Sequence, residues 1–352
     1  MNIADLIDQV TKNSASDLHV LVGSPPTLRV HGNLVSVPNT TPLDAKETME
    51  LALELMNAEQ KKIFQEEKEI DFSYQFKDTG RFRVNAYMQR ESAAFAMRLI
   101  PTQISSIDQL QLPQVVHDIV KLRQGLVLLT GPTGEGKSTS LAAMIDEINQ
   151  TREEHIITIE DPIEFVHSPV RSIISQREIH QDTNGWGAAL RSVLREDPDV
   201  VLIGEMRDLE TISAALTIAE TGHLVLATLH TNSASQTIDR IIDVYPENQQ
   251  PQIRQQLAAT IAAIFSQRLI PTRKEGRVAA VEVLIANLAV KNLIREGKTF
   301  QIDNVMQTGS ELGMITMEAS LANWVQTGVV SQEMAAMYTT RVGEFERLLA
   351  GK

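Results

Sequence analysis

The sequence predicts a protein in which a small α+β domain precedes a larger α/β domain with a parallel sheet. Over residues 1–100, short apolar segments alternate with polar residues, which is typical of antiparallel strands with one exposed face. Beyond them, four continuous apolar runs alternate with helix-like segments, which is typical of strands covered on both faces. The length of 352 residues accommodates two domains.

Composition and charge exclude several classes of protein. With 43% hydrophobic and 22% charged residues, the chain is expected to fold rather than to stay disordered. A net charge of −13 argues against a surface that coats nucleic acid. The absence of cysteine excludes disulfides, thiolate zinc sites and cysteine nucleophiles. No signal-peptide pattern opens the chain and no apolar run approaches the roughly 20 residues of a membrane helix, so we expect an intracellular protein.

The first domain is predicted over residues 1–100 and begins with short strands. Period-two patterns between turn signals predict them at Asp17–Val22, Thr27–His31 and Leu34–Val37. Helix-forming residues over Leu43–Phe64 predict one long helix.

An antiparallel meander is predicted to complete this domain. Apolar residues alternate with polar ones over Ile70–Phe76, Phe82–Met88 and Phe95–Leu99, with an Asp-Thr-Gly turn at residues 78–80. One face of the meander is therefore expected to pack against a helix.

Residues 101–113, which contain two prolines and two serines, predict an interdomain linker. The second domain is expected over residues 114–352. Its strands are predicted at Gly125–Thr130, Ile156–Ile159, Val200–Ile203 and Leu224–Thr228, and its helices at Ser138–Asn149, Trp186–Arg195 and Leu209–Glu220. From about Pro246 onward the chain is predicted to be mostly helical, including the amphipathic stretch from Asn248 through Ile264.

A phosphate-binding loop follows the first of these strands. The sequence GPTGEGKST satisfies G-x-x-x-x-G-K-[ST] in the strand–loop–helix context that the motif requires. Glycines let backbone N–H groups turn toward anionic oxygens, and the following helix adds its positive N-terminal end. The nucleotide-binding candidates are Gly131, Pro132, Thr133, Gly134, Glu135, Gly136, Lys137, Ser138 and Thr139.

Glu135 is unusual within this loop, because a carboxylate in a phosphate cradle repels the ligand. We expect its side chain to point to solvent while its N–H faces the nucleotide.

Polar residues end three later strands. Glu160, Asp161 and Glu164 follow one strand, Glu205 follows the next, and His230 follows the third. Ligands of open α/β sheets bind at the carboxyl ends of the strands. Carboxylates there are suited to holding Mg²⁺, directly or through water, and to orienting or deprotonating the attacking water.

Four segments together resemble the Walker A, Asp-box, Walker B and His-box motifs of the secretion-superfamily ATPases. They are GPTGEGKST, IITIEDPIEFVH, LREDPDVVLIGEMRD and TGHLVLATLHTNSA, in the order and spacing of that family. The stretch AVKNLIRE over Ala289–Glu296 resembles the C-terminal signature of the members that retract type IV pili, although Val290 and Lys291 replace its usual Ile-Arg.

The resemblance implies a PAS-like N-terminal domain joined to a RecA-like ATPase domain in a homo-hexameric ring. It implies a motor that uses ATP and Mg²⁺ to drive pilus disassembly and retraction. The expected location is cytoplasmic, at the inner face of the cytoplasmic membrane. The ring would be peripheral to the membrane through an inner-membrane pilus platform protein, with no nucleic acid as partner.

The resemblance also implies residue roles. Lys137 would hold the phosphates, and Ser138 or Thr139 would bind the phosphates and Mg²⁺. Glu205 would be the Walker B glutamate, and Gly204, where many ATPases carry Asp, implies a metal held through water.

The remaining roles fall on the Asp box and the His box. Glu164 matches the Asp-box acid proposed as general base. His223 and His230 match the His-box pair, with His230 near the chemistry and His223 in nucleotide binding.

Three arginines of the meander are further candidates. Arg81, Arg83 and Arg98 alternate with apolar neighbours and so project from the polar face of their strands. A solvated face with unrelated charges is the alternative. A neighbouring phosphate-loop domain favours a role in stabilising phosphoryl charge, which the resemblance implies as well.

Other functions compatible with these motifs remain open. A pilus-extension or type II secretion ATPase usually carries a tetracysteine metal site, which this chain cannot form. A DNA translocase is disfavoured by the acidic charge. An accessory retraction subunit that senses nucleotide without acting as the main motor is the remaining alternative.

Overall fold

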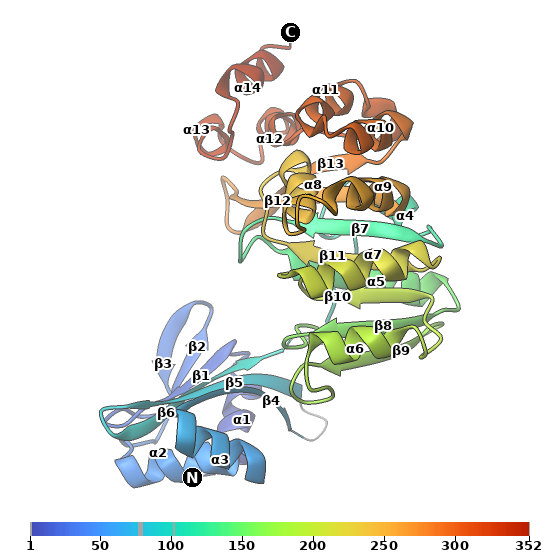
Figure 1. Cartoon of the computed structure of the whole chain (residues 1–352). Coiled ribbons are helices and arrows are strands. Elements are labelled where there is room, and N and C mark those ends of the chain that lie inside the picture. The colour runs from blue at the N-terminus through green and yellow to red at the C-terminus, as the bar shows by residue number, and fades with distance from the viewer. Residues whose placement is uncertain (1, 77–79, 101–102, 352) are drawn as a thin grey trace. The chain divides into compact units, whose positions relative to one another are not determined.

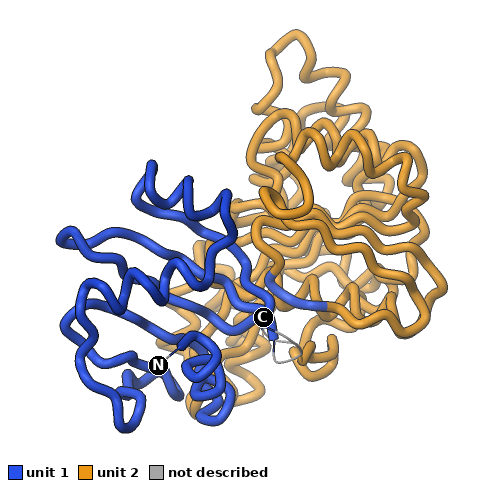
Figure 2. The backbone as a smooth tube through the Cα atoms, turned by 90° about the horizontal axis from the view of Figure 1, so that it is seen from below, with its two compact units in different colours: residues 1–102, 164–166 blue, residues 103–163, 167–352 orange. Residues whose placement is uncertain are grey.

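The computed structural model describes residues 2–76, 80–100 and 103–351. The chain divides into two compact units, one of residues 1–102 and 164–166 and the other of residues 103–163 and 167–352 (Figure 2). In the predicted linker, residues 101 and 102 lie outside the described residues, and Gln103–Pro113 groups with the second unit. Both units combine helices with sheets, so the predicted α/β class with a smaller α+β domain is confirmed.

The first unit contains a six-stranded antiparallel sheet in the order β3-β2-β1-β6-β5-β4 (Figure 1). The β4–β5–β6 pairing confirms the predicted meander, although residues 78 and 79 of its turn lie outside the described residues. Apolar side chains of the helices and of one sheet face form a common core. The elements are α1 (Ile3–Lys12), β1 (Asp17–Val20), β2 (Thr27–Val30), β3 (Asn33–Ser36), α2 (Ala45–Glu54), α3 (Ala58–Glu67), β4 (Glu69–Phe76), β5 (Gly80–Gln89) and β6 (Ser92–Leu99).

The prediction of a single helix over Leu43–Phe64 is wrong, because α2 and α3 occupy this stretch. Asn57 begins α3: its side chain accepts a hydrogen bond from the N–H of Gln60, and the Gln60 side chain accepts one from the N–H of Asn57. This reciprocal cap satisfies backbone donors that a continuous helix would have paired within itself. The new start redirects the chain so that Phe64 enters the core.

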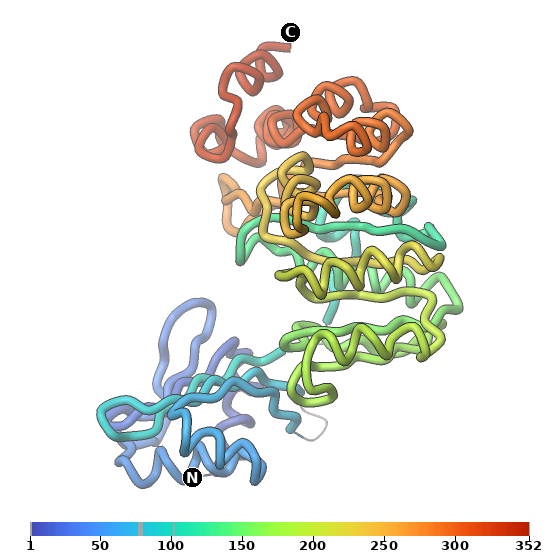
Figure 3. The backbone as a smooth tube through the Cα atoms, viewed as in Figure 1, coloured from blue at the N-terminus to red at the C-terminus, as the bar shows by residue number. Residues whose placement is uncertain are grey.

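The second unit contains a seven-stranded sheet in the order β13-β12-β7-β11-β10-β8-β9 (Figures 1 and 3). Neighbouring strands from β12 to β9 run parallel, and β13 is antiparallel to β12. Its sheet elements and their first helices are α4 (Val116–Ile119), β7 (Gly125–Thr130), α5 (Lys137–Thr151), β8 (His155–Glu160), β9 (Ile173–Glu178), α6 (Trp186–Val193), β10 (Val200–Ile203), α7 (Leu209–Glu220), β11 (Leu224–Leu229), α8 (Ala234–Asp243), α9 (Gln250–Thr260), β12 (Ile261–Pro271) and β13 (Arg277–Ile285).

Both faces of this sheet are covered, as the continuous apolar runs predict. In β7, Leu126 and Leu128 belong to the core shared with α6 to α9, whereas Val127 and Leu129 belong to the core shared with α4 and α5. Because successive side chains of a strand point to opposite faces, a strand buried on both sides must be apolar throughout.

The predicted helical stretch through Ile264 is partly wrong, because the helix α9 ends at Thr260 and the strand β12 begins at Ile261. β12 pairs with β7 on one side and β13 on the other, so backbone hydrogen bonding in the sheet overrides the local helical pattern. Helices do follow β13. They are α10 (Leu288–Glu296), η1 (Thr299–Gln301), α11 (Ile302–Gln307), η2 (Ser310–Leu312), α12 (Met317–Gln326), α13 (Gln332–Ala336) and α14 (Val342–Leu349).

Across the described residues, none of the helices has both the length and the apolar character needed to cross a lipid bilayer.

Candidate active site

The phosphate loop connects the fully buried strand β7 to the helix α5. At Gly131, φ is +141°, and a Cβ atom would lie 2.5 Å from the carbonyl oxygen of Gln267. Gly136, at φ +79°, is the N-cap residue of α5, and no side chain among the described residues caps that helix N-terminus. The loop therefore leaves the first N–H groups of α5 available to an anion, as the motif predicts.

Lys137 is buried, and its ammonium group is held inside the loop. Nζ donates hydrogen bonds to the carbonyl oxygens of Gly131 at 2.7 Å and Pro132 at 2.8 Å. It also lies 3.5 Å from Nδ1 of His230, which follows the neighbouring strand β11. Two partners of this ammonium group are thus neutral oxygens, and a phosphate oxygen would be a stronger partner than either.

The side chain of Glu135 does not point to solvent as expected. Its Oε2 accepts a hydrogen bond from the N–H of Leu269, and its Oε1 lies 3.7 Å from Nη1 of Arg268. The carboxylate is only 18% exposed. The expectation is wrong because β12 lies directly beside the loop. Its backbone N–H at Leu269 and the guanidinium group of Arg268 take the place of water as partners of the carboxylate.

Glu205 and His230 meet at the carboxyl ends of β10 and β11. Oε1 of Glu205 lies 2.9 Å from Nε2 of His230 and 2.7 Å from Nε of Arg207. This geometry favours the His230 tautomer in which Nε2–H donates to Glu205 while Nδ1 accepts from Lys137. One imidazole therefore joins the loop lysine to the predicted Walker B glutamate.

Gly204 sets the position of Glu205. A Cβ at Gly204 would lie 3.3 Å from Cα of Glu160 and from the carbonyl oxygen of Ile159 on β8. The N–H of Gly204 donates to that same Ile159 oxygen at 2.8 Å. A side chain at position 204 would therefore crowd the end of β8.

The environment keeps the Glu205 carboxyl group ionised. Its partial burial by itself raises its pKa, but the hydrogen bond and charge of Arg207, with His230 beside it, outweigh this and lower the pKa below 4.5. An ionised carboxylate at this edge is the form that can ligate a cation or orient water.

His223 lies at the opposite end of β11 from His230. Its Nδ1 lies 3.0 Å from both the carbonyl oxygen of Ile218 and the hydroxyl of Thr221. A strand rises about 3.3 Å per residue, so the seven residue steps from His223 to His230 along β11 separate the two histidines by about 23 Å. The chain by itself therefore does not bring His223 to the phosphate loop.

The Asp-box acids divide between the two units. Glu160 ends β8 and accepts hydrogen bonds from Thr158 at 2.7 Å and Gln176 at 3.3 Å. Glu164 groups with the first unit, so its role at the phosphate loop stays a prediction.

The three arginines share one face of the first unit. Arg83 and Arg98 are directly opposite each other in the β5–β6 register, and Arg81 lies two residues before Arg83 on β5. Each of the first two is accompanied by a carboxylate. Arg98 donates to Asp17 at 2.8 Å, and Nε of Arg83 lies 3.9 Å from Asp71. The guanidinium groups gather as expected, and their function stays a prediction.

Three comparisons place this arrangement among known proteins. The family model described as Type II/IV secretion system protein matches residues 1–340. This chain belongs to that family.

Relatives within the family resemble it over nearly the whole length. The type IV pilus retraction ATPase PilT of Pseudomonas aeruginosa is 48% identical over 335 residues, which cover 95% of this chain and 97% of that protein. The type IV pilus ATPase PilU of the same organism is 37% identical over 350 residues, covering 99% of this chain and 91% of that protein. A crystal structure of the pilus retraction motor PilT with bound ADP is 44% identical and superposes with a TM-score of 0.93 over 99% of both chains.

Strand β12 of this Type II/IV secretion system protein supplies site residues that the sequence analysis missed. The side chain of Gln267 donates to the carbonyl oxygen of Glu135 at 2.7 Å and accepts from the hydroxyl of Ser140 at 2.9 Å. Ser266 accepts a hydrogen bond from Thr130 at 2.9 Å. The sequence analysis missed these residues because it predicted a mostly helical region here. Without a strand, nothing indicated that this segment lies beside the phosphate loop.

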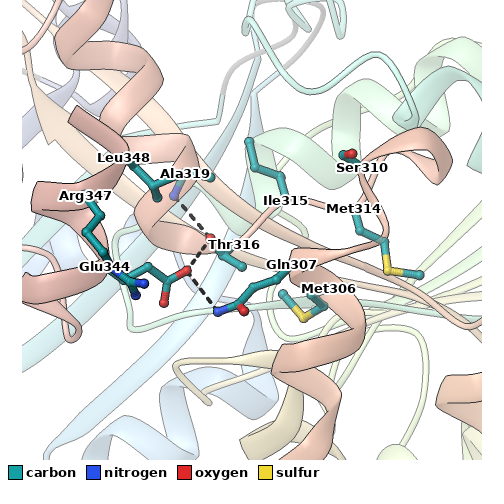
Figure 4. A pocket seen from close by; sticks show the side chains of 10 residues that line it. All are labelled: Met306, Gln307, Ser310, Met314, Ile315, Thr316, Ala319, Glu344, Arg347 and Leu348. Atoms are coloured by element: carbon teal, nitrogen blue, oxygen red, sulfur yellow. Dashed lines mark hydrogen bonds between the residues drawn. The ribbon is translucent and has the colours of Figure 1, made fainter. Parts of the chain in front are cut away.

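A cavity of about 460 Å³ lies among the C-terminal helices, away from these residues (Figure 4). Its polar side is a small network in which Thr316 and Gln307 donate to Glu344 at 3.5 and 3.3 Å. None of the predicted site residues lines it.

Proposed function

We propose that this protein is the motor ATPase of a type IV pilus, which couples ATP hydrolysis to pilus disassembly and retraction and so to twitching motility. The observation that carries the proposal is the continuous contact from Lys137 through His230 to Glu205 beside a phosphate loop. Identity of 48% to the pilus retraction ATPase PilT supports the specific role. As expected from the sequence, the motor acts as a homo-hexameric ring at the inner face of the cytoplasmic membrane. It is held there through a pilus platform protein, and no nucleic acid takes part.

ATP binding follows from the geometry of the loop. The N–H groups of the loop and of the first turn of α5 surround the phosphates, and Lys137 exchanges the carbonyl oxygens of Gly131 and Pro132 for phosphate oxygens. His230 contacts both Lys137 and Glu205, so a shift of the lysine side chain would also move the hydrogen-bonding partner of Glu205.

The residues present also fit Mg²⁺. No cluster of three or more His, Asp or Glu side chains suited to a metal occurs in the part of the chain that the structure describes. Mg²⁺ commonly needs only one or two protein oxygens, because phosphates and water supply the remainder. Ser138 at the start of α5 and the ionised Glu205 are the protein groups that would hold it. When bound, the metal neutralises phosphate charge.

Hydrolysis requires a carboxylate that orients or deprotonates water and a cation that stabilises developing phosphoryl charge. We assign the first task to Glu164 or Glu205, and the second to Arg81, Arg83 and Arg98, supplied from the first unit of the same chain or of a neighbour. His223, at the far end of β11, is suited to contact with a neighbouring subunit rather than with its own loop. Closure around ATP and reopening after phosphate release would convert hydrolysis into displacement.

The type IV pilus ATPase PilU is 37% identical to this chain. An accessory retraction subunit that senses nucleotide is the second candidate, because nucleotide binding at a phosphate loop does not by itself require rapid turnover. The higher identity to PilT favours the main motor. Purified protein should hydrolyse ATP, and Glu205→Gln should bind ATP while losing about 100-fold or more in turnover. Tight binding with no turnover by the unmutated protein would favour the accessory role.

Deletion of the gene in its host, followed by imaging of surface fibres, tests the biological role. Loss of retraction should leave many fibres and no twitching, and a copy encoding Lys137→Ala should not restore movement. Cells without any fibres would indicate an extension motor instead.

A further inference from the structure

Glu135 and Arg268 connect the phosphate loop to the loop that carries His230. Arg268 on β12 lies 3.7 Å from the Glu135 carboxylate through Nη1, and its Nη2 donates to Oδ1 of Asn232 at 3.0 Å. Asn232 comes two residues after His230. A single guanidinium group thus touches both loops that meet at Lys137 and His230.

The phosphate loop lies directly against β12. The backbone of Gln267 leaves no room for a Cβ at Gly131, and its side-chain amide would lie 2.9 Å from a Cβ at Gly136. Leu269 donates its N–H to Glu135. The strand therefore contacts the loop at its beginning, its middle and its end.

We propose that Arg268 is a positioning residue that neutralises Glu135 and holds the phosphate loop and the His230 loop in one nucleotide-binding arrangement. The inference rests on the proposed ATPase function and concerns the same site. We refer to the contact among Glu135, Arg268 and Asn232 as the latch.

Charge explains why the latch is needed. Glu135 lies inside the phosphate-loop motif, so its carboxylate adds negative charge close to a polyanion. Both partners are largely shielded from solvent, with side chains 18% and 23% exposed, so water screens this charge poorly. Arginine is suited to the task because its planar fork can engage two acceptors in different directions.

The latch makes a prediction of opposite sign for its two partners. Arg268→Gln leaves Glu135 uncompensated and should weaken ATP binding by about five- to twentyfold, and ADP binding by less because ADP carries less charge. Glu135→Gln should bind ATP more tightly than the unmutated protein, because it removes negative charge beside the phosphates while Arg268 stays positive. The double variant Glu135→Gln with Arg268→Gln should recover most of the lost ATP affinity, since both charges are gone and only the contact of Arg268 with Asn232 is missing.

Binding is measured by titration with fluorescent ATP and ADP analogues on the full-length protein, alongside thermal unfolding of each variant. Arg277→Gln is the matched control, because it removes the same charge at the exposed start of β13. Arg268→Lys keeps the charge but not the planar fork, so it should lose less ATP affinity than Arg268→Gln, and a loss as large as that of Arg268→Gln would contradict the charge argument.

Recovery of ATP affinity in the double variant distinguishes charge compensation by Arg268 from a role in folding alone. If Arg268→Gln binds ATP as the unmutated protein does, or if the double variant is as weak as Arg268→Gln, the latch is overturned. Failure of the unmutated protein to bind any nucleotide would instead overturn the proposed function itself.

Discussion

At the level of single residues, Glu282 on β13 is a buried carboxyl group outside the phosphate loop. It is 4% exposed, and its carboxylate accepts a hydrogen bond from the N–H of Ala234 at 2.7 Å. Burial, with the nearby charges of Asp303 and Glu318, raises its pKa to about 7, although the Ala234 bond and the charge of Arg341 act in the other direction. The residue therefore takes up a proton on folding near neutral pH.

This shift predicts how stability depends on pH. Between the ordinary value of 4.5 and about 7, the folded chain binds more protons at Glu282 than the unfolded chain, so the free energy of unfolding should fall as pH rises through this window. At about 1.4 kcal/mol per pKa unit, the total is about 3 kcal/mol. Glu282→Gln, which keeps an acceptor for Ala234, should remove this fall.

Denaturant unfolding at pH 5 and pH 8 measures the effect. The exposed Glu311→Gln variant serves as control and should leave the difference between the two pH values unchanged. Equal pH dependence in the Glu282→Gln and unmutated proteins would contradict the assignment.

At the level of secondary-structure elements, β12 contacts the phosphate loop and so restricts which residues the loop can contain. β12 pairs with β7, so the residues after Ser266 pass directly behind the loop. This is why Gly131 cannot be replaced: its φ of +141° is unfavourable for other residues, and its Cβ position is occupied by the backbone of Gln267.

Gly131→Ala should therefore separate the loop from β12 and abolish measurable ATP binding, with a stability loss of about 2 kcal/mol or more. Gly343→Ala is the matched control. Gly343 lies in α14 with nothing within 4 Å of its Cβ position, so this change should raise stability by about 0.4–1 kcal/mol. Thermal unfolding and nucleotide titration of both variants test this, and normal ATP binding by Gly131→Ala would show that the loop tolerates the displacement.

For the protein as a whole, the proposed ATPase mechanism requires the arginines of a first unit to act on nucleotide held by a phosphate loop, in the same chain or in a neighbouring subunit. The ion pair between Arg83 and Asp71 is long and exposed, so it contributes little stability. A substitution at Arg83 should then affect chemistry without affecting folding.

We expect Arg83→Ala to lower ATP turnover by about tenfold or more while leaving the melting temperature and nucleotide affinity nearly unchanged. Arg90→Ala, at the exposed turn between β5 and β6, is the control for charge loss and should keep full turnover. Turnover equal to that of the unmutated protein in Arg83→Ala would identify the arginine face as an ordinary solvated surface.

Particular residues show how far sequence reasoning reaches. The predicted strand-end positions of Glu205 and His230 and the predicted phosphate-loop position of Lys137 agree with the structure, because parallel pairing of the short apolar strands brings these segments together. Arg83 and Arg98 were placed on one face, because alternation in a strand has a fixed period. The break at Asn57 and the strand at Ile261 were missed, because a cap and a sheet partner outweigh local helix propensity.

Residue spacing along the chain is enough to predict the fold class, the phosphate loop and the polar strand ends, since each depends on local patterns of residue type. The packed structure was needed to show that Glu135 turns toward Arg268, that His223 lies far from His230, and that Gln267 supports the loop. Those facts depend on which strand lies beside which, and strand order is set by packing among segments distant in the chain.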